Sequence, residues 1–213
     1  MPPPVAVHPL GDLVAAPALA AVYGNRGDLH AGGDRIVRGW QGRRWIACVL
    51  ELRGRRHGFL PPRGYTGLLF RDEATALAAG HRPCAECRRE DFEAYREAWA
   101  RAHGGGRPDV DTMDRALHAE RLLPGARPRA GLTAARPLPP VPVDAALPDG
   151  AIVVAPDGDL LVAAGGALRR WAFGPLGPPA APSGALRLVT PAASVAVLRA
   201  GYRPALVPLV AGA

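Results

Sequence analysis

The feature that most constrains this chain is a Cys-x-x-Cys turn, Cys84 to Cys87, placed directly between two segments with helical patterns. Two cysteines at this spacing can direct both sulfur atoms toward one tetrahedral metal ion. Upstream, Asp72 is a suitable N-cap for a helix over residues 73–79. Downstream, large apolar side chains recur at helical spacing over residues 88–102. We therefore expect two helices that hold the turn between them.

Two thiols supply half of a tetrahedral site, so a metal ion needs two more ligands. The other cysteine of the chain is Cys48, in a strand-like run over residues 44–52. The histidines nearest in sequence are His30, His57 and His81. Three cysteines and one histidine would form a closed structural zinc site.

Two alternatives to a metal site stay open for these thiols. Cys48 alone fits a small buried apolar residue in a strand. The pair at residues 84 and 87 fits a redox dithiol or two uncoordinated thiols, although the βαβ pattern expected around a redox pair is absent from the sequence. The spacing of the pair favours the metal site.

The run LAAGHRPCAEC resembles the second half of the metal-binding domain of the Ada DNA-repair family, which carries an EA…AAG[FY]RPC[KR]RC signature after a strand. Upstream, the run from Val22 to Asn25, followed by His30, is similar to the V.GN…YH opening of stand-alone Ada-like modules. The resemblance covers about residues 22–89 and is specific over residues 73–87.

This resemblance implies a domain that holds zinc through four cysteines and binds DNA. It places Cys84 and Cys87 on the family's second ligand pair, but the first pair is not matched, because the first cysteine after His30 is Cys48. In the repair members one cysteine also accepts a methyl group from a phosphotriester. That cysteine is not carried over, so self-methylating repair is not expected. We predict a zinc site of Cys48, Cys84, Cys87 and His30, with His30 chosen from the upstream resemblance.

The positive charge of the chain is concentrated near this region. The net charge is +7, and residues 26–71 hold ten arginines against three acidic residues, a difference of +7 as well. Clustered arginines with interleaved aromatic rings are typical of nucleic-acid faces. The predicted nucleic-acid contacts are Arg38, Arg43, Arg44, Arg53, Arg55, Arg56 and Arg63. The alternative is a solvated hairpin in a chain whose arginine content reflects a GC-rich genome.

A second candidate for chemistry is the pair Asp114 and His118, four residues apart in a predicted helix over residues 109–123. In a nuclease such a pair can coordinate a metal ion or activate water. The neighbouring Arg115 and Glu120 instead indicate an ordinary charged helix face. We therefore assign no catalytic residue.

These patterns predict an α+β fold: a small zinc-stabilised N-terminal α+β module followed by a β-rich C-terminal part with one closing helix. The predicted parts are an N-terminal arm (1–21), an Ada-like metal-binding module with its C-terminal helix (22–104), a helix and proline-rich linker (105–147) and a small β-rich domain (148–213). A hairpin pattern begins the last part.

The N-terminal residues contain no basic leader and no apolar run of membrane-spanning length, so neither a secretory signal nor a membrane partner is expected. Three cysteines, an odd number, fit a reducing compartment. We therefore expect a cytoplasmic location.

The function favoured by the sequence is a zinc-binding, nucleic-acid-binding protein, with DNA preferred over RNA and the Ada-like module supplying the basic face. One alternative is a metal-dependent enzyme that acts on nucleic acid or a modified base, with an open metal position at His30 or His81. Another is a protein-interaction module whose zinc is purely structural. A shell of three thiolates and one histidine would favour the two interpretations without catalysis, the nucleic-acid-binding protein and the interaction module.

Overall fold

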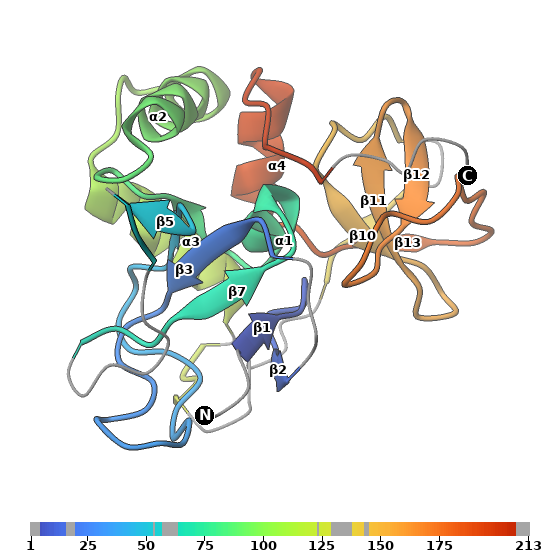
Figure 1. The fold of residues 1–213 in the computed structure, drawn as a ribbon. Helices are drawn as coiled ribbons and strands as arrows, with labels where there is room; N and C mark the ends of the chain where they lie inside the picture. The colour runs from blue at the N-terminus through green and yellow to red at the C-terminus, as the bar shows by residue number, and fades with distance from the viewer. Residues whose placement is uncertain are drawn as a thin grey trace.

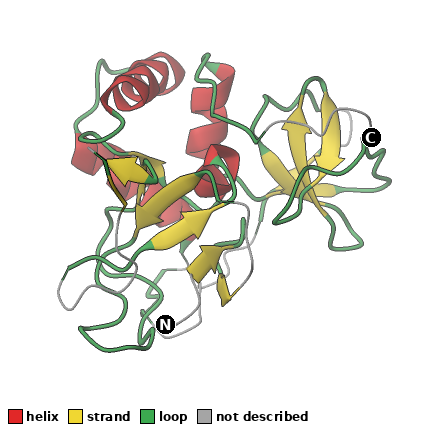
Figure 2. Cartoon of the chain, in the orientation of Figure 1, coloured by secondary structure: helices red, strands yellow, loops and turns green. Residues whose placement is uncertain are grey.

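The computed structural model describes residues 5–15, 20–52, 54–56, 64–122, 124–128, 138–142 and 145–207. In this part of the chain the helices are α1 (Glu73–Ala78), α2 (Arg89–His103), α3 (Val110–Arg121) and α4 (Ala192–Arg199). The strands form one sheet from the N-terminal half, a second sheet from the C-terminal third, and a short hairpin of β5 (Glu51–Leu52) and β6 (Arg55–Arg56) (Figure 1). The predicted α+β class and closing helix are confirmed (Figure 2).

The N-terminal sheet is mixed, with strand order β2-β1-β7-β3-β4-β8. Its strands are β1 (Val5–Val7), β2 (Leu13–Ala15), β3 (Val22–Asn25), β4 (Ile46–Cys48), β7 (Leu68–Phe70) and β8 (Arg82–Pro83). β1 runs parallel to β7, with Ala6 opposite Leu69. Residues 5–15, predicted as an arm, thus form an edge hairpin of the sheet. The burial of Ala6 and Val7 explains this pairing, because both side chains leave water.

The C-terminal sheet is antiparallel, with strand order β12-β11-β10-β13-β9. Its strands are β9 (Pro140–Val141), β10 (Ile152–Val154), β11 (Leu160–Ala164), β12 (Ala167–Arg170) and β13 (Leu186–Leu188). The predicted hairpin is formed by β10 and β11. Gly158 in its turn has a φ of 92°, which glycine adopts without steric cost.

Helix α1 lies between the two sheets (Figure 1), and every residue in it is buried. Ala76 packs with the core of the N-terminal sheet, whereas Ala74 and Ala78 pack with apolar residues of the C-terminal sheet. Leu77 contributes to a third cluster with the other helices. Alanine suits this position because its small side chain lets elements approach the helix on several sides.

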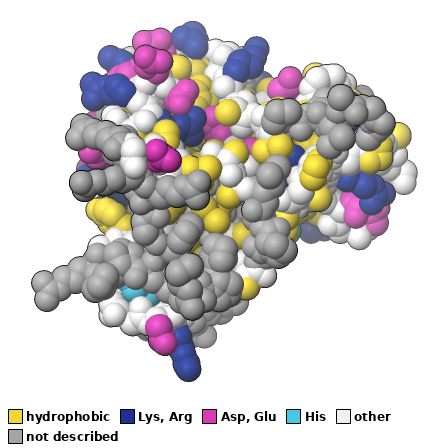
Figure 3. Space-filling view, in the orientation of Figure 1, with side chains coloured by type: hydrophobic (Ala, Val, Ile, Leu, Met, Phe, Trp, Pro, Cys, Tyr) yellow, Lys and Arg dark blue, Asp and Glu magenta, His cyan; other side chains and the backbone are white. Residues whose placement is uncertain are grey.

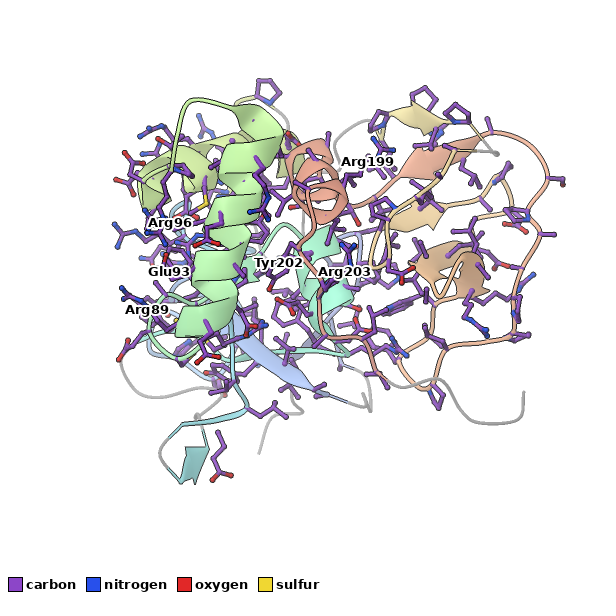
Figure 4. All side chains as sticks on the ribbon, turned by 90° about the horizontal axis from the view of Figure 1, so that it is seen from above. Arg89, Glu93, Arg96, Arg199, Tyr202 and Arg203 are labelled. Atoms are coloured by element: carbon purple, nitrogen blue, oxygen red, sulfur yellow. The ribbon has the colours of Figure 1, made fainter. Side chains whose placement is uncertain are left out.

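Helix α2 buries the apolar face that its sequence predicts, with Phe92, Tyr95 and Trp99 in the core. It lies beside α4 (Figure 4). The opposite side of α2 carries Arg89, Glu93 and Arg96, which Figure 4 shows along the helix, and Glu93 forms ion pairs with both arginines. Acidic and basic side chains are interspersed over this end of the molecule (Figure 3), so it is an ordinary solvated face.

One hydrophobic cluster joins the N-terminal helices to the C-terminal sheet. It contains residues of α2 and α3 together with Val153 of β10, Leu161 of β11 and Val197 of α4. Because these side chains share one core, the predicted boundary at residue 147 lies between segments that pack together. The cysteine-bearing part is therefore supported by the C-terminal third of the chain.

Candidate metal centre and adjoining pocket

Two neighbouring parallel strands bring Cys48 and Cys84 together. Cys48 is the last residue of β4, and Cys84 directly follows β8, which pairs with β4 through Ala47 and Pro83. The Cys84 N–H also donates a hydrogen bond of 2.9 Å to the Ala47 carbonyl. Because parallel strands end at the same edge of a sheet, the two thiols meet there.

Cys87 joins them through the Cys-x-x-Cys turn. The Arg88 N–H donates a 3.1 Å hydrogen bond to the Cys84 carbonyl, and α2 begins at the next residue. The three sulfur atoms lie within 4.8 Å of one another, and all three thiols are free. Within the described residues, this is the one group of His, Cys, Asp and Glu side chains that could hold a metal ion.

Hydrogen bonds among the three thiols shift their pKa values in different directions. The pKa of Cys84 is strongly lowered because the thiols of Cys48 and Cys87 hydrogen-bond to its sulfur, and the backbone N–H groups of Cys87 and Glu86 add to this effect. The pKa of Cys48 is strongly raised because its thiol is hydrogen-bonded to Cys84 and to Cys87 and is buried. A bound metal cation would allow all three thiols to ionise, since coordination deprotonates a thiol.

An apolar layer covers one side of the cysteine group. Cys48 and Cys84 are buried with Tyr23 and Leu69 in one hydrophobic cluster. Burial raises the pKa of Tyr23 to about 12, and the neighbouring Cys48 contributes. Such a layer limits access of water to the sulfur atoms and thereby strengthens their interaction with a cation.

His30 does not belong to this group, contrary to the expectation from the upstream resemblance. Its Nδ1 atom lies 2.6 Å from Thr66 Oγ1 and 3.3 Å from the Asp28 carboxylate. The Leu29 N–H also donates to Thr66 Oγ1, at 2.7 Å. The ring is therefore directed into a local polar network that anchors the segment after β3, and its proposed role as fourth ligand does not agree with this geometry.

The other two candidate histidines do not complete the group in the described part of the chain. His81 is buried, and its Nε2 atom accepts a 3.3 Å hydrogen bond from Arg26 Nε. Its ring packs against Phe70, with ring centroids 4.6 Å apart. His57 lies outside the described residues.

The predicted nucleic-acid contacts have different surroundings. Arg43 and Arg44 are exposed and Arg38 is half-buried. Arg53 and Arg63 lie outside the described residues. For Arg55 and Arg56 the structure describes the backbone in β6 and not the side chains. Two other arginines of the sequence cluster, Arg26 and Arg71, are fully buried. The surface charge of residues 26–71 is therefore smaller than the sequence count indicates.

The buried arginines have structural partners. The guanidinium of Arg26 lies 4.3 Å from the centre of the Trp45 ring, and that of Arg121 lies 4.0 Å from the same ring. Burial lowers the pKa of Arg26 to about 9. Arg71 forms an ion pair with Asp72 and donates a 2.6 Å hydrogen bond to the Gly174 carbonyl. Arg26 and Arg71 therefore make contacts inside the protein, although the sequence count treats them as surface charge.

A pocket of about 760 Å³ adjoins the cysteine group. Its wall includes Cys84 and Glu86 from the turn, Asn25 from β3, and Arg43 and Arg44 from the segment before β4. Tyr65 also lines it, with 64% of its surface exposed. The structure thus places exposed arginines and an aromatic ring around a pocket that Cys84 also lines.

Asp114 also reaches this pocket, but its carboxylate is already engaged. Its two oxygens accept hydrogen bonds of 2.9 Å from Arg82 Nε and Nη2. His118 lies near the Trp45 ring, with centroids 6.4 Å apart. Because Asp114 is held by a buried arginine, the two residues do not form a free acid and base pair.

Sequence reasoning missed a group of buried polar contacts next to the turn, at Arg88. Arg88 forms an ion pair of 2.8 Å with Glu73 at the start of α1. Glu73 also accepts hydrogen bonds from the Tyr202 hydroxyl at 2.6 Å and from the Ala205 N–H at 2.9 Å. No spacing along the sequence signals this group, because Glu73, Arg88 and Tyr202 come from three separate segments.

Comparison with protein-family models, with curated proteins and with solved structures found no match to this chain. Among the described residues, no helix combines the length and apolar character needed to cross a membrane.

Proposed function

We propose that this chain is a zinc-binding protein that binds nucleic acid. The observation that carries the proposal is the convergence of three free cysteines, with sulfur atoms within 4.8 Å of one another, beside a pocket lined by Arg43 and Arg44. Zinc is the metal that best suits a buried, thiolate-rich set of ligands. Cys48, Cys84 and Cys87 would hold the ion, which would supply binding free energy to the fold.

The nucleic-acid part of the proposal is supported by the surface next to the cysteines. Arg43 and Arg44 are exposed and can contact phosphates, which supply most of the affinity for nucleic acid. Tyr65, at 64% exposure, offers a ring on which a base can stack. The resemblance of residues 22–89 to the Ada family favours DNA over RNA.

A thiolate site of this kind needs reduced cysteines, and all three are free. We therefore propose that the protein works in a reducing compartment such as the cytoplasm.

The test is binding of labelled DNA and RNA by the purified protein over a series of salt concentrations, with zinc content measured on the same samples. Arg43→Gln/Arg44→Gln should weaken DNA binding and reduce the salt slope by up to about two units, because each phosphate contact releases counterions. The matched control is Arg187→Gln/Arg199→Gln, which removes the same charge from exposed positions on β13 and α4.

The control should bind as the wild type does. Equal weakening in both double variants would show that overall charge, and not this surface, drives binding. Absence of binding at low salt would refute the nucleic-acid part, while the zinc measurement decides the metal part separately.

A further inference from the structure

The turn that carries Cys84 and Cys87 is also a wall of the pocket. Cys84 belongs to both the cysteine group and the pocket lining, and the residues between the cysteines, Ala85 and Glu86, line the pocket too. An ion bound by Cys84 would therefore be held by a residue of the pocket wall.

The cysteine group supplies three donors. Within the described residues, no histidine, aspartate or glutamate joins Cys48, Cys84 and Cys87. Structural zinc sites are closed by four protein ligands, whereas sites with three protein ligands take the fourth from water or another molecule. Counted over the described residues alone, the group is of the second kind, and the pocket adjoins it at Cys84.

The charges around the pocket favour a neutral ligand. The ionisable side chains that line it, apart from Cys84, are Arg43, Arg44, Arg82, Glu86, Asp111 and Asp114, three of each sign. Arg82 is paired with Asp114 at 2.9 Å and Arg44 with Asp111 at 3.5 Å. A divalent ion with three thiolates carries a net charge of −1, so a fourth anionic donor would be repelled and a neutral donor would not.

The uncharged groups of the pocket suit a flat ring. The oxygens of Gln41 and Asn25 accept backbone hydrogen bonds from Asp28 at 2.8 Å and Gly27 at 3.4 Å, which leaves their NH₂ groups as donors for a ligand. Tyr65 adds an exposed aromatic ring. The volume of about 760 Å³ falls within the range of roughly 300–1,000 Å³ for sites of small organic molecules.

We propose that the pocket binds a neutral heteroaromatic molecule whose ring nitrogen becomes the fourth ligand of the ion held by Cys48, Cys84 and Cys87. Imidazole-containing and purine-type rings belong to this class. The inference rests on the metal part of the proposed function and does not depend on nucleic-acid binding. It assigns Tyr65 as a residue that stacks on the bound ring.

The experiment uses the full chain loaded with Co²⁺, whose visible spectrum reports the ligands of the ion. Imidazole is added as the neutral probe and thiocyanate as an anionic probe that also binds through nitrogen. Imidazole should change the spectrum in a saturable manner while one ion stays bound per chain, and thiocyanate should require a much higher concentration.

Tyr65→Ala tests whether the probe binds through the pocket. Loss of the ring should weaken imidazole binding by about five- to tenfold, the effect expected for one aromatic contact. Tyr65→Phe keeps the ring and should bind imidazole as the wild type does. Both substitutions lie at an exposed position, so folding should be unaffected, which circular dichroism of the variants checks.

A cobalt spectrum that does not respond to imidazole would overturn the inference, since the shell would then be closed by the chain. A response that appears only in His57→Ala would overturn it in the same way and name the closing residue. Equal imidazole affinity in Tyr65→Ala and wild type would overturn the assignment of the pocket. Failure of the chain to bind Co²⁺ at all would instead refute the metal part of the proposed function.

Discussion

The Tyr202 hydroxyl donates a 2.6 Å hydrogen bond to the Glu73 carboxylate, which joins the segment after α4 to the start of α1. Tyr202 also packs edge-on against Tyr95 of α2, with ring centroids 5.2 Å apart, and Figure 4 shows it beside that helix. Glu73 in turn pairs with Arg88, the residue after Cys87. The C-terminal segment therefore supports the cysteine turn through one buried carboxylate.

Tyr202→Phe should lower the free energy of unfolding by about 1–3 kcal/mol, because the buried Glu73 carboxylate loses a donor. Glu73 is 1% exposed, so water does not readily replace the hydroxyl. Urea unfolding measures the change. Tyr65→Phe is the control, since its exposed hydroxyl should contribute nothing. Equal stability of Tyr202→Phe and wild type would show that this hydrogen bond makes no net contribution to the free energy of unfolding.

Gly80 and Gly201 end α1 and α4 in the same way. After each helix, two successive residues donate backbone hydrogen bonds to carbonyls three and five residues back. This is the Schellman arrangement, which needs a left-handed residue, and the two glycines have φ values of 83° and 106°. The shared A-G-x-R-P run is thus a repeated helix end.

Gly201→Ala should destabilise the protein by about 1–2 kcal/mol, which is the cost of a left-handed alanine. No clash adds to this cost, because the nearest atom to an added Cβ is Arg101 Nη2 at 3.8 Å. Gly80→Ala should cost more. Its Cβ would lie 2.7 Å from Arg121 Cδ, and Arg121 is held over the Trp45 ring. Urea unfolding of both variants gives the comparison, and equal losses would contradict the role of Arg121.

Local features of the fold could be predicted from the sequence. Asp72 caps α1 as expected, with its Oδ1 accepting a 2.8 Å hydrogen bond from the Thr75 N–H. The apolar face of α2 is buried at Phe92 and Tyr95. Both features depend on side chains within one or two helical turns, so spacing along the chain is enough to find them.

Features that depend on distant segments could not be predicted. The pairing of β1 with β7 and the burial of Arg26 beside Trp45 are set by tertiary packing, which periodicity does not report. The candidate site shows the same division. The spacing of Cys84 and Cys87 indicated their shared turn, whereas the direction of the His30 ring depends on Thr66, far along the chain.

Cys87→Ser should reduce the zinc content from about one ion per chain to near zero and lower the melting temperature, because such sites contribute binding free energy to the fold. Treatment of the wild type with a chelator should have the same effect. Glu86→Gln, in the same turn and exposed, is the control and should retain zinc. Elemental analysis and thermal unfolding measure both quantities. A wild type that is folded and free of metal would refute the site.

His118 should make stability depend on pH. Its pKa is lowered from 6.5 to about 4, mainly by burial and then by Arg121 and Arg43. Between these values the unfolded chain binds a proton at this residue and the folded chain does not. Stability from this residue is therefore fully present above about pH 6.5 and is lost as the pH falls toward 4.

The measurement compares urea unfolding of the wild type and His118→Gln at about pH 7 and about pH 5, where the linkage differs. The variant should lose less stability on acidification. The pKa of His81 is also lowered by burial. Its effect on the change of stability with pH is the same in both proteins and therefore cancels in the comparison. Identical losses in the two proteins would contradict the assignment to His118.

Asp114→Ala should destabilise the protein by about 3–5 kcal/mol, because it leaves the buried Arg82 guanidinium without its counter-charge. Arg82→Met/Asp114→Leu removes both charges and should recover much of this loss. Asp111→Ala is the control, since its carboxylate pairs with Arg44 at the surface at 3.5 Å and should change stability by less than about 1 kcal/mol. Urea unfolding of the three variants separates these cases. If Asp114→Ala instead kept wild-type stability and abolished a metal-dependent cleavage of DNA or RNA by the purified protein, Asp114 would be part of an active site and its pairing with Arg82 would be incidental.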